Sequence, residues 1–328
     1  MRRRQFLSTS ALLCGGLIAG GVARGREDPI RIILAGYGPP TSSFSKGLSH
    51  IGNRLTDRFG EDVDIRYVYN IMDLAYDSGG DLVWLVDSGV LTLAYLTMFN
   101  DIPALQVAAL PFLFPDSASA RAAMDGALGQ SAIETIEAHS DLRVLGFFEN
   151  GFRHISNSVR PVHTPDDLQG LTIRVLGAQA RMLELMGANA KVTLLPAVYG
   201  GLESGELHGQ ENPFENVVTY NLYKVQQHYT MTYHSYLSRP IFLHEPSFEA
   251  WPDDLQAEMQ AAVNEAVDLQ RRLHDQAEID SAEVIRRAGG EIVELTPAQR
   301  DAFVATVAPI YDDAQTEFSR ELLSLVNL

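Results

Sequence analysis

The sequence predicts an α/β protein folded as two lobes, with mixed sheets flanked by helices. A β-branched segment at 30–35, a helix-like segment at 41–59 and an alternating segment at 63–69 form a strand–helix–strand start, which favours parallel strands. A second series of the same kind begins near Gly151, and no low-complexity linker separates the two. The 328 residues, 46% of them hydrophobic, are sufficient for two domains of roughly 100–150 residues.

The remaining elements of both series are indicated by apolar periodicity and by helix end signals. Thr164 followed by Pro165 starts a short helix, as an N-cap with proline at the first helical position. The expected elements lie at 118–136 (helix), 143–148 (strand), 164–170 (short helix), 171–175 (strand) and 196–204 (helix, ended by Gly205).

The C-terminal third is helical in pattern. Apolar residues at helical spacing predict one long amphipathic helix over 253–287, and Thr296 to Gln299 is a capping-box start for a last helix. We expect lobe I to comprise residues 26–150 with contributions from about 240–290. Lobe II then comprises 151–239 with C-terminal helix contributions from about 291–328, and the long helix spans both lobes.

Residues 1–25 have the pattern of a signal peptide, with a basic start, an apolar middle and small residues near Ala23. Arg3 and Arg4 resemble a twin-arginine export signal, although the general secretory route remains open. A permanent anchor is disfavoured because the apolar stretch is short for a span of roughly 20 residues. A lipoprotein is disfavoured because Leu13 precedes Cys14, the chain's one cysteine. The expected location is periplasmic, with the signal removed.

The net charge of −17 excludes most nucleic-acid binders, which need clustered cations. Removal of residues 1–25, which hold four arginines and no acidic residue, changes it to −21. An anionic ligand would be repelled by this field, so its site must be locally cationic. The chain has only three lysines, so arginines must supply that charge. They are Lys46, Lys191 and Lys224.

Motifs for catalysis, cofactors and metals are missing. The segment 36–41 lacks the third glycine of a dinucleotide fingerprint, and Pro39 and Pro40 remove two backbone donors. No P-loop, G-x-S-x-G or H-E-x-x-H sequence is present. The spacings between His228, His234 and His244 match no common zinc pattern. We therefore expect no enzyme, no cofactor and no metal site.

Two arginines mark the most informative region. Arg153 follows a strand end and Gly151 in a polar stretch, and Arg174 interrupts the apolar strand 171–175. A buried guanidinium requires an acceptor, since an unpaired buried charge is costly. That acceptor is either a carboxylate of the protein or a bound ligand, and these residues alone favour neither. A third polar cluster, at 209–214, offers amide and carboxylate groups.

Several ordered blocks of this sequence resemble the substrate-binding subunits of tripartite ATP-independent periplasmic (TRAP) transporters, the DctP-like family. The resemblance covers nearly the whole chain from Ile30 onward. The blocks that carry it are 39–44, 110–114, 149–158, 164–175, 196–199 and 205–213.

The resemblance implies a periplasmic binding protein of the type II-like class, with two lobes that close on an organic acid by a hinge motion. It implies that Arg174 pairs with the ligand carboxylate through a two-pronged contact, with Arg153 and Asn212 as further contacts. Glu149, Tyr37 and Phe214 fall where selectivity-setting residues occur. The implied partners are the small and large TRAP membrane subunits, and we expect a monomer.

Other interpretations are a sensor that presents the acid to a membrane receptor, and an α/β hydrolase or lyase. Between ligand classes, Glu149 favours hydroxylated acids such as uronates or aldonates over C4-dicarboxylates like succinate. The reason is that a carboxylate beside an anionic ligand is useful only if it accepts hydrogen bonds from ligand hydroxyls.

Overall fold

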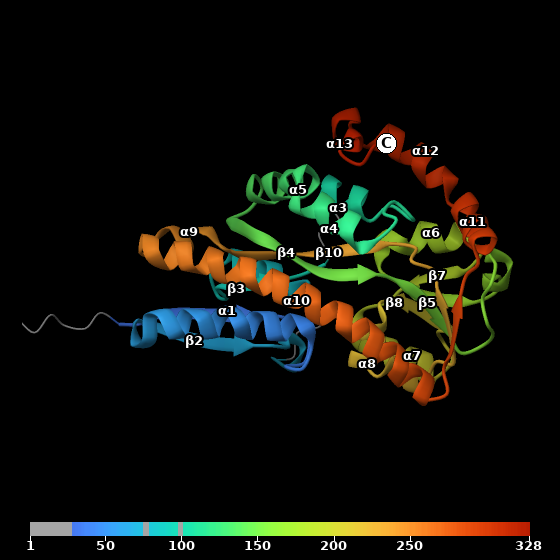
Figure 1. Ribbon diagram of the computed structural model, residues 1–328, viewed down its shortest axis with the longest axis horizontal. Helices are drawn as coiled ribbons and strands as arrows, with labels where there is room; N and C mark the ends of the chain where they lie inside the picture. Colours follow the sequence, from blue (N-terminus) through green and yellow to red (C-terminus); the bar gives the residue numbers. More distant parts are fainter. Residues whose placement is uncertain (1–27, 75–78, 98–100) are drawn as a thin grey trace, which may run out of the picture.

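The computed structural model describes residues 28–74, 79–97 and 101–328. They form two β-sheets covered by helices, with the longest helix running past both sheets (Figure 1). The expected signal peptide at 1–25 lies outside the described residues. Within the described parts of the chain, no helix combines the length and hydrophobicity of a membrane span.

The first sheet, which defines lobe I, has the strand order β2-β1-β3-β10-β4. Strand β1 is parallel to β2 and β3, as the sequence predicts, whereas β10 is antiparallel to both of its neighbours. Its strands are β1 (Ile30–Ala35), β2 (Val63–Val68), β3 (Leu93–Tyr95), β4 (Leu142–Phe152) and β10 (Tyr236–His244). Its helices are α1 (Ser43–Phe59), α2 (Asp81–Asp87), α3 (Pro103–Ala108), α4 (Ser117–Asp125), α5 (Ala127–Glu137) and α9 (Glu245–Glu249).

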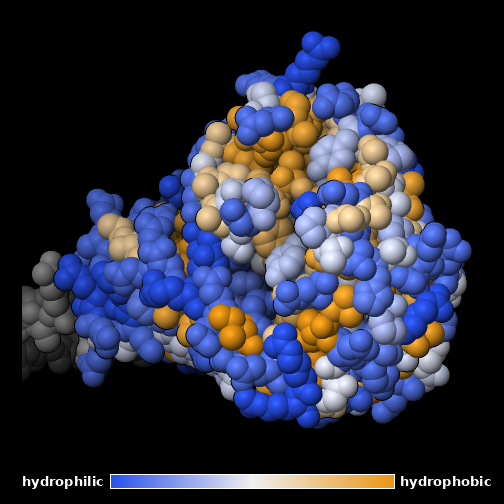
Figure 2. All heavy atoms as spheres, turned by 45° about the vertical axis from the view of Figure 1, so that its right-hand side comes forward, coloured by the Kyte–Doolittle hydropathy of each residue, from blue (hydrophilic) through white to orange (hydrophobic). Residues whose placement is uncertain are grey.

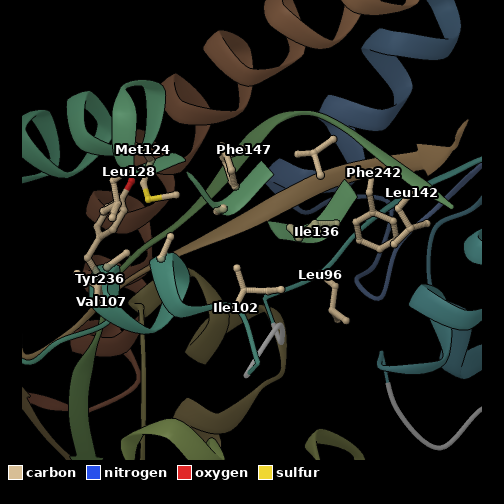
Figure 3. Close-up of a cluster of buried hydrophobic side chains, with 14 of the residues drawn as sticks. Leu96, Ile102, Val107, Met124, Leu128, Ile136, Leu142, Phe147, Tyr236 and Phe242 are labelled. Atoms are coloured by element: carbon tan, nitrogen blue, oxygen red, sulfur yellow. The ribbon is translucent and has the colours of Figure 1, made fainter. Parts of the chain in front are cut away.

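Each face of this sheet buries a separate hydrophobic cluster, because successive strand residues point to opposite faces. Leu34 and Ile241 pack against α1 on one face. On the other face, Phe242 and Leu142 pack against the helices α2 to α5 (Figure 3). The sheet is therefore an internal layer.

The second sheet, which defines lobe II, has the order β11-β9-β5-β8-β6-β7 and mixes parallel with antiparallel pairs. Its strands are β5 (His154–Asn157), β6 (Thr172–Val175), β7 (Asn189–Val192), β8 (Gly209–Asn212), β9 (His228–Met231) and β11 (Glu291–Glu294). Its helices are α6 (Ala180–Leu185), α7 (Leu195–Glu203) and α8 (Phe214–Thr219).

The connections between the two lobes are short. Strand β4 continues through Arg153 into β5, and β9 continues through 232–235 into β10. Helix α10 (Asp253–Arg287) packs on α1 and β4 of lobe I and on α8 of lobe II, so the long helix has the predicted bounds and spans both lobes. These connections permit a hinge.

The end of the chain differs from the expected lobe assignment. Helix α11 (Pro297–Thr306) packs on lobe II through Phe303. Helices α12 (Ala308–Glu317) and α13 (Arg320–Ser324) return to lobe I, where Ala314, Leu322 and Leu323 join the hydrophobic cluster of α2 to α5. The segment 291–328 therefore contributes to both lobes, and not to lobe II alone.

Candidate functional site

A cavity of about 90 Å³ lies between the lobes, and we call it the interlobe cavity. A single water requires roughly 10–15 Å³ on such a measure, so the space suits a small molecule. Apolar side chains such as Met72, Leu96 and Leu194 form part of the wall. The polar side chains on the wall are Tyr37, Thr97, Asn150, Arg153, Arg174, Thr193, Asn212, Asn216, Tyr220 and Arg239.

Arg174 reaches this cavity from strand β6 and is 3% exposed. Its Nε donates to the carbonyl oxygen of Thr193 at 2.8 Å. Among the described residues, no carboxylate lies within 4.0 Å of its guanidinium. Burial lowers its pKa to about 10, against a smaller opposing effect from the charge of Glu211. Arg174 is thus a buried cation without a described protein counter-ion.

Arg153 lies at the connection between β4 and β5 and is 1% exposed. Its guanidinium forms an ion pair with buried Glu211, with Nη2 at 2.9 Å from Oε1 and 2.7 Å from the backbone oxygen. The same Nη2 donates to Asn212 Oδ1 at 3.0 Å. Burial would raise the pKa of Glu211, but Arg153 and His234 lower it to about 2. Arg153 is therefore neutralised within the protein, although it lines the cavity.

Tyr37 and Asn212, two of the expected ligand-binding residues, also line the cavity. The hydroxyl of Tyr37 is 3.1 Å from Thr97 Oγ1. The Asn212 oxygen accepts from Arg153 and from Asn216. Both side chains are held by protein contacts, which is the preorganisation a binding site needs.

Glu149 and Phe214 are not brought to the cavity. The side chain of Glu149 is fully buried and accepts from Arg121 Nε at 2.7 Å, away from the lining residues. Phe214 packs on His154, with ring centroids 4.7 Å apart. The structure therefore does not support either residue as a ligand contact. Glu149 therefore gives no reason to favour hydroxylated ligands, because that preference assumed that its carboxylate lies beside the ligand.

Asn150, the residue after Glu149, faces the cavity instead, and the sequence did not single it out. In the β4–β10 ladder, Leu237 pairs with Gly151 and Ser238 pairs with Glu149. Asn150 is the extra residue of a β-bulge, a distortion that re-aims side chains next to functional sites. Its Nδ2 is buried and has no described partner.

Arg239 is a second cavity residue that the sequence analysis missed. It interrupts the apolar strand β10, the same signal that drew attention to Arg174. Its guanidinium lies 3.8 Å from the Phe44 ring centroid and donates to Thr97 Oγ1 at 2.7 Å and to Asn150 Oδ1. No carboxylate of the described residues forms an ion pair with it.

The charge of the interlobe cavity is opposite to that of the whole protein. Three arginines line it, and its lining among the described residues includes no aspartate or glutamate. The outer surface shown in Figure 2 is largely hydrophilic, broken by separate hydrophobic patches, and the chain carries −17 overall. The cavity is a local cationic site in an acidic protein, as an anionic ligand requires. No group of three or more metal-ligating side chains is found in the described parts of the chain.

Two α/β lobes joined by a hinge, with a cationic cavity between them, define a solute-binding protein of the periplasmic type. The sequence matches the family described as bacterial extracellular solute-binding protein, family 7, over residues 79–317. The chain belongs to this family and is a TRAP substrate-binding subunit, which confirms the resemblance. Members of the family are substrate-binding proteins rather than enzymes.

Solved structures show the same fold. A TRAP periplasmic solute-binding protein from Chromohalobacter salexigens with bound D-glucuronate has a TM-score of 0.83 and 28% identity, over 90% of this chain and 97% of that one. One from Xanthobacter autotrophicus Py2 with bound β-D-galacturonate has a TM-score of 0.81 and 27% identity, over 90% and 97%. The predicted two-lobed α/β class is confirmed.

A further relative is the C4-dicarboxylate-binding periplasmic protein DctP of Rhodobacter capsulatus. It is 27% identical over 220 residues, which are 66% of this chain and 66% of that protein. The family members named here are periplasmic solute-binding proteins for organic acids.

Proposed function

We propose that this protein captures a small organic carboxylate in the interlobe cavity and delivers it to a TRAP-type membrane permease. The observation that carries the proposal is Arg174, a buried guanidinium with free donor capacity in a cavity without a described acid. A ligand carboxylate would supply the missing counter-charge through a two-pronged contact. Arg239 and the free amide of Asn150 add donors for further ligand oxygens.

The proposed ligands are sugar acids, such as uronates or aldonates, and C4-dicarboxylates. Support for the first class comes from the two relatives with bound uronates, and for the second from the R. capsulatus relative. The interlobe cavity is suited to any small acid that has acceptor oxygens at more than one position. The permease partners are the small and large TRAP membrane subunits, with this protein as a monomer.

A thermal-shift screen against uronates, aldonates and C4-dicarboxylates tests the proposal. A ligand at 100 times its Kd stabilises the folded protein by about 2.7 kcal/mol, so a true ligand raises the melting temperature clearly. At the same concentration, this acid should raise the melting temperature of Arg174→Ala far less. If no acid of the three classes produces a shift, the proposed function is wrong.

We further propose export with removal of residues 1–25. Replacement of both Arg3 and Arg4 by lysine should leave precursor in the cytoplasm if the twin-arginine route is used. Normal periplasmic accumulation of this double variant would indicate the general secretory route instead.

A further inference from the structure

The buried face of helix α10 changes from apolar to polar where the two lobes meet. Over 255–267 its buried residues are all apolar, and the next two are Gln270 and His274, which are 0% and 4% exposed. Glu278 follows at the same spacing of four, so the three side chains lie on one face of the helix. Buried polar side chains need partners, and Gln270, His274 and the partly buried Glu278 find them in both lobes.

Gln270 holds lobe I. Its side-chain oxygen accepts from the backbone N–H of Glu149 at 2.9 Å, and its nitrogen donates to Ser43 Oγ at 3.2 Å. Glu278 holds lobe II, because it accepts from the backbone N–H of Glu215 at 2.6 Å at the start of α8. One helix face thus fixes the beginning of α1 and the beginning of α8.

Glu215 joins these two helices directly. One carboxylate oxygen accepts from the backbone N–H of Ser43, the first residue of α1, at 3.0 Å. The other oxygen is 2.8 Å from His274 Nδ1, and Glu215 is 5% exposed. A carboxylate from lobe II therefore caps a 17-residue helix of lobe I, at the end where the helix dipole favours negative charge.

The charges of this contact are mutually supporting. Burial alone would raise the pKa of Glu215, but the hydrogen bond and charge of His274 hold it below its usual value. Burial alone would lower the pKa of His274, but the hydrogen bond to Glu215 and the nearby carboxylates of Glu278 and Glu149 raise it to about 9. At neutral pH the contact is a charged pair.

The opposite side of α8 faces the ligand site. Asn216 and Tyr220 line the interlobe cavity. The Asn216 amide is 3.4 Å from Asn150 Oδ1, and the Tyr220 hydroxyl donates to the Tyr37 carbonyl at 3.4 Å. Both contacts cross from lobe II to lobe I, as the contact of Glu215 does. The position of α8 against lobe I therefore shapes the cavity wall.

We propose that Glu215 is a positioning residue for ligand capture, which holds α8 against the start of α1. It thereby favours the closed form, the arrangement with the contacts between α8 and lobe I described above, without touching the ligand. This inference rests on the proposed function for its affinity readout. A residue that shifts only the fraction of closed protein changes the apparent affinity for every ligand by one common factor. Substitution of a ligand contact such as Arg174 instead changes the affinity by a factor that differs from one ligand to another.

Ser43→Pro is the sharpest test. Proline at the first helical position keeps the helix, and Ser42 already has the extended backbone, φ −65° and ψ 154°, that precedes a proline. The substitution removes the N–H that Glu215 accepts from and the Ser43 hydroxyl, and its ring Cδ takes the direction of the lost hydrogen, so the Glu215 carboxylate is also displaced from the helix end. Ser43→Ala is the matched control, because it removes the hydroxyl and keeps the N–H. Glu215→Gln is a second variant, which removes the charge with the side-chain shape retained.

Affinities are measured by calorimetric titration with D-glucuronate, D-galacturonate and succinate. We expect Ser43→Pro and Glu215→Gln to weaken every acid that binds by the same factor of about tenfold, the value of one charge-assisted hydrogen bond. Ser43→Ala should stay within about twofold of the unaltered protein. A loss confined to one acid, or an unchanged affinity in both variants, would overturn the proposal.

Lobe separation gives a second readout that needs no ligand. Spin labels at Asn53→Cys on α1 and Glu203→Cys on α7, both exposed positions, report the distance between lobes in full-length protein carrying Cys14→Ser. The short-distance population should shrink in Ser43→Pro and remain in Ser43→Ala. If none of the acids binds, the proposed function is wrong, but the distance between the spin labels still tests the positioning role of Glu215. Equal distance distributions in all variants would refute its role.

Discussion

Arg153 and Arg174 are two buried arginines on the wall of one cavity, and their surroundings differ in one decisive respect. Arg153 has a buried carboxylate, Glu211, in a two-point contact. Arg174 has a single backbone acceptor and no described counter-ion. Since an unpaired buried charge destabilises a fold, loss of Arg153 should affect folding, whereas Arg174 has a cost of burial that the proposed ligand would offset. Burial alone therefore does not distinguish the two arginines, whereas the presence or absence of a described counter-ion does, and on this ground we propose Arg174 as the ligand-binding one.

The largest expected effect is on stability at the paired site. Arg153→Ala leaves Glu211 buried without its counter-charge, which typically lowers the free energy of unfolding by roughly 3–5 kcal/mol. Chemical denaturation measures it. Arg181→Ala is the control, because it breaks the exposed ion pair with Asp313, and such pairs contribute about 0–1 kcal/mol.

The contrast between paired Arg153 and unpaired Arg174 would be wrong if Arg153→Ala unfolded at the same denaturant concentration as the unaltered protein. That result would mean that Glu211 is neutralised by other groups, with His234 the nearest. Arg153 would then belong with Arg174 as a ligand residue.

The second effect is on affinity at the unpaired site. Arg174→Ala should weaken binding of the acid found in the screen by at least about a hundredfold, because the ligand carboxylate would be buried without its partner. The unliganded variant should keep its stability or gain some, since burial disfavours the charged guanidinium there and lowers its pKa. Calorimetric titration and unliganded melting temperatures measure the two quantities.

Arg174→Lys is the matched variant for geometry. An ammonium keeps the charge but does not reproduce a two-pronged contact, so affinity should remain well below that of the unaltered protein. Near-normal affinity in Arg174→Ala, combined with a lower melting temperature, would make Arg174 a structural residue like Arg153.

The same comparison shows how far the sequence alone leads. Arg174 was recognisable because a charge interrupts an apolar strand, and the lobes and the long helix followed from hydrophobic periodicity. The partner of Arg153 was not recognisable, because Glu211 lies 58 positions along the chain and only the pairing of β5 with β8 brings them together. Contacts of this range depend on tertiary structure, which one-dimensional patterns do not specify.

The two expected site residues that do not line the cavity, Glu149 and Phe214, have this position for a local reason. Glu149 and Asn150 are adjacent, and a strand places adjacent side chains on opposite faces, so an error of one position exchanges a cavity residue for a buried ion pair. The bulge at Asn150 adds to the difficulty because nothing in a single sequence reveals the extra residue. Phe214 begins α8, whose cavity side is formed by Asn216, two residues further on.

The smallest expected effect concerns Arg239, which is intermediate between the two arginines compared above. Its charge faces no described carboxylate, but its guanidinium stacks on Phe44 and donates to Thr97. A cation–π contact contributes about 0.5–2 kcal/mol, which offsets part of the free-energy cost of burying the charge. Arg239→Gln should therefore lower both the free energy of unfolding and the ligand affinity moderately. We expect a loss of about 1 kcal/mol in stability and about tenfold in affinity.

Phe44→Leu is the control for Arg239, since it removes the ring beneath the guanidinium and leaves the cavity lining unchanged. It should lower the melting temperature with little change in affinity, because the ring supports the charge and does not reach the ligand. A loss of affinity in Arg239→Gln as large as that in Arg174→Ala, without a loss of stability, would place Arg239 in the unpaired class. The reverse result, a loss of stability alone, would place it with Arg153. In either case the three arginines would fall into two classes instead of a graded series. The first result would give the cavity two ligand-binding arginines, Arg174 and Arg239, and the second would leave Arg174 alone.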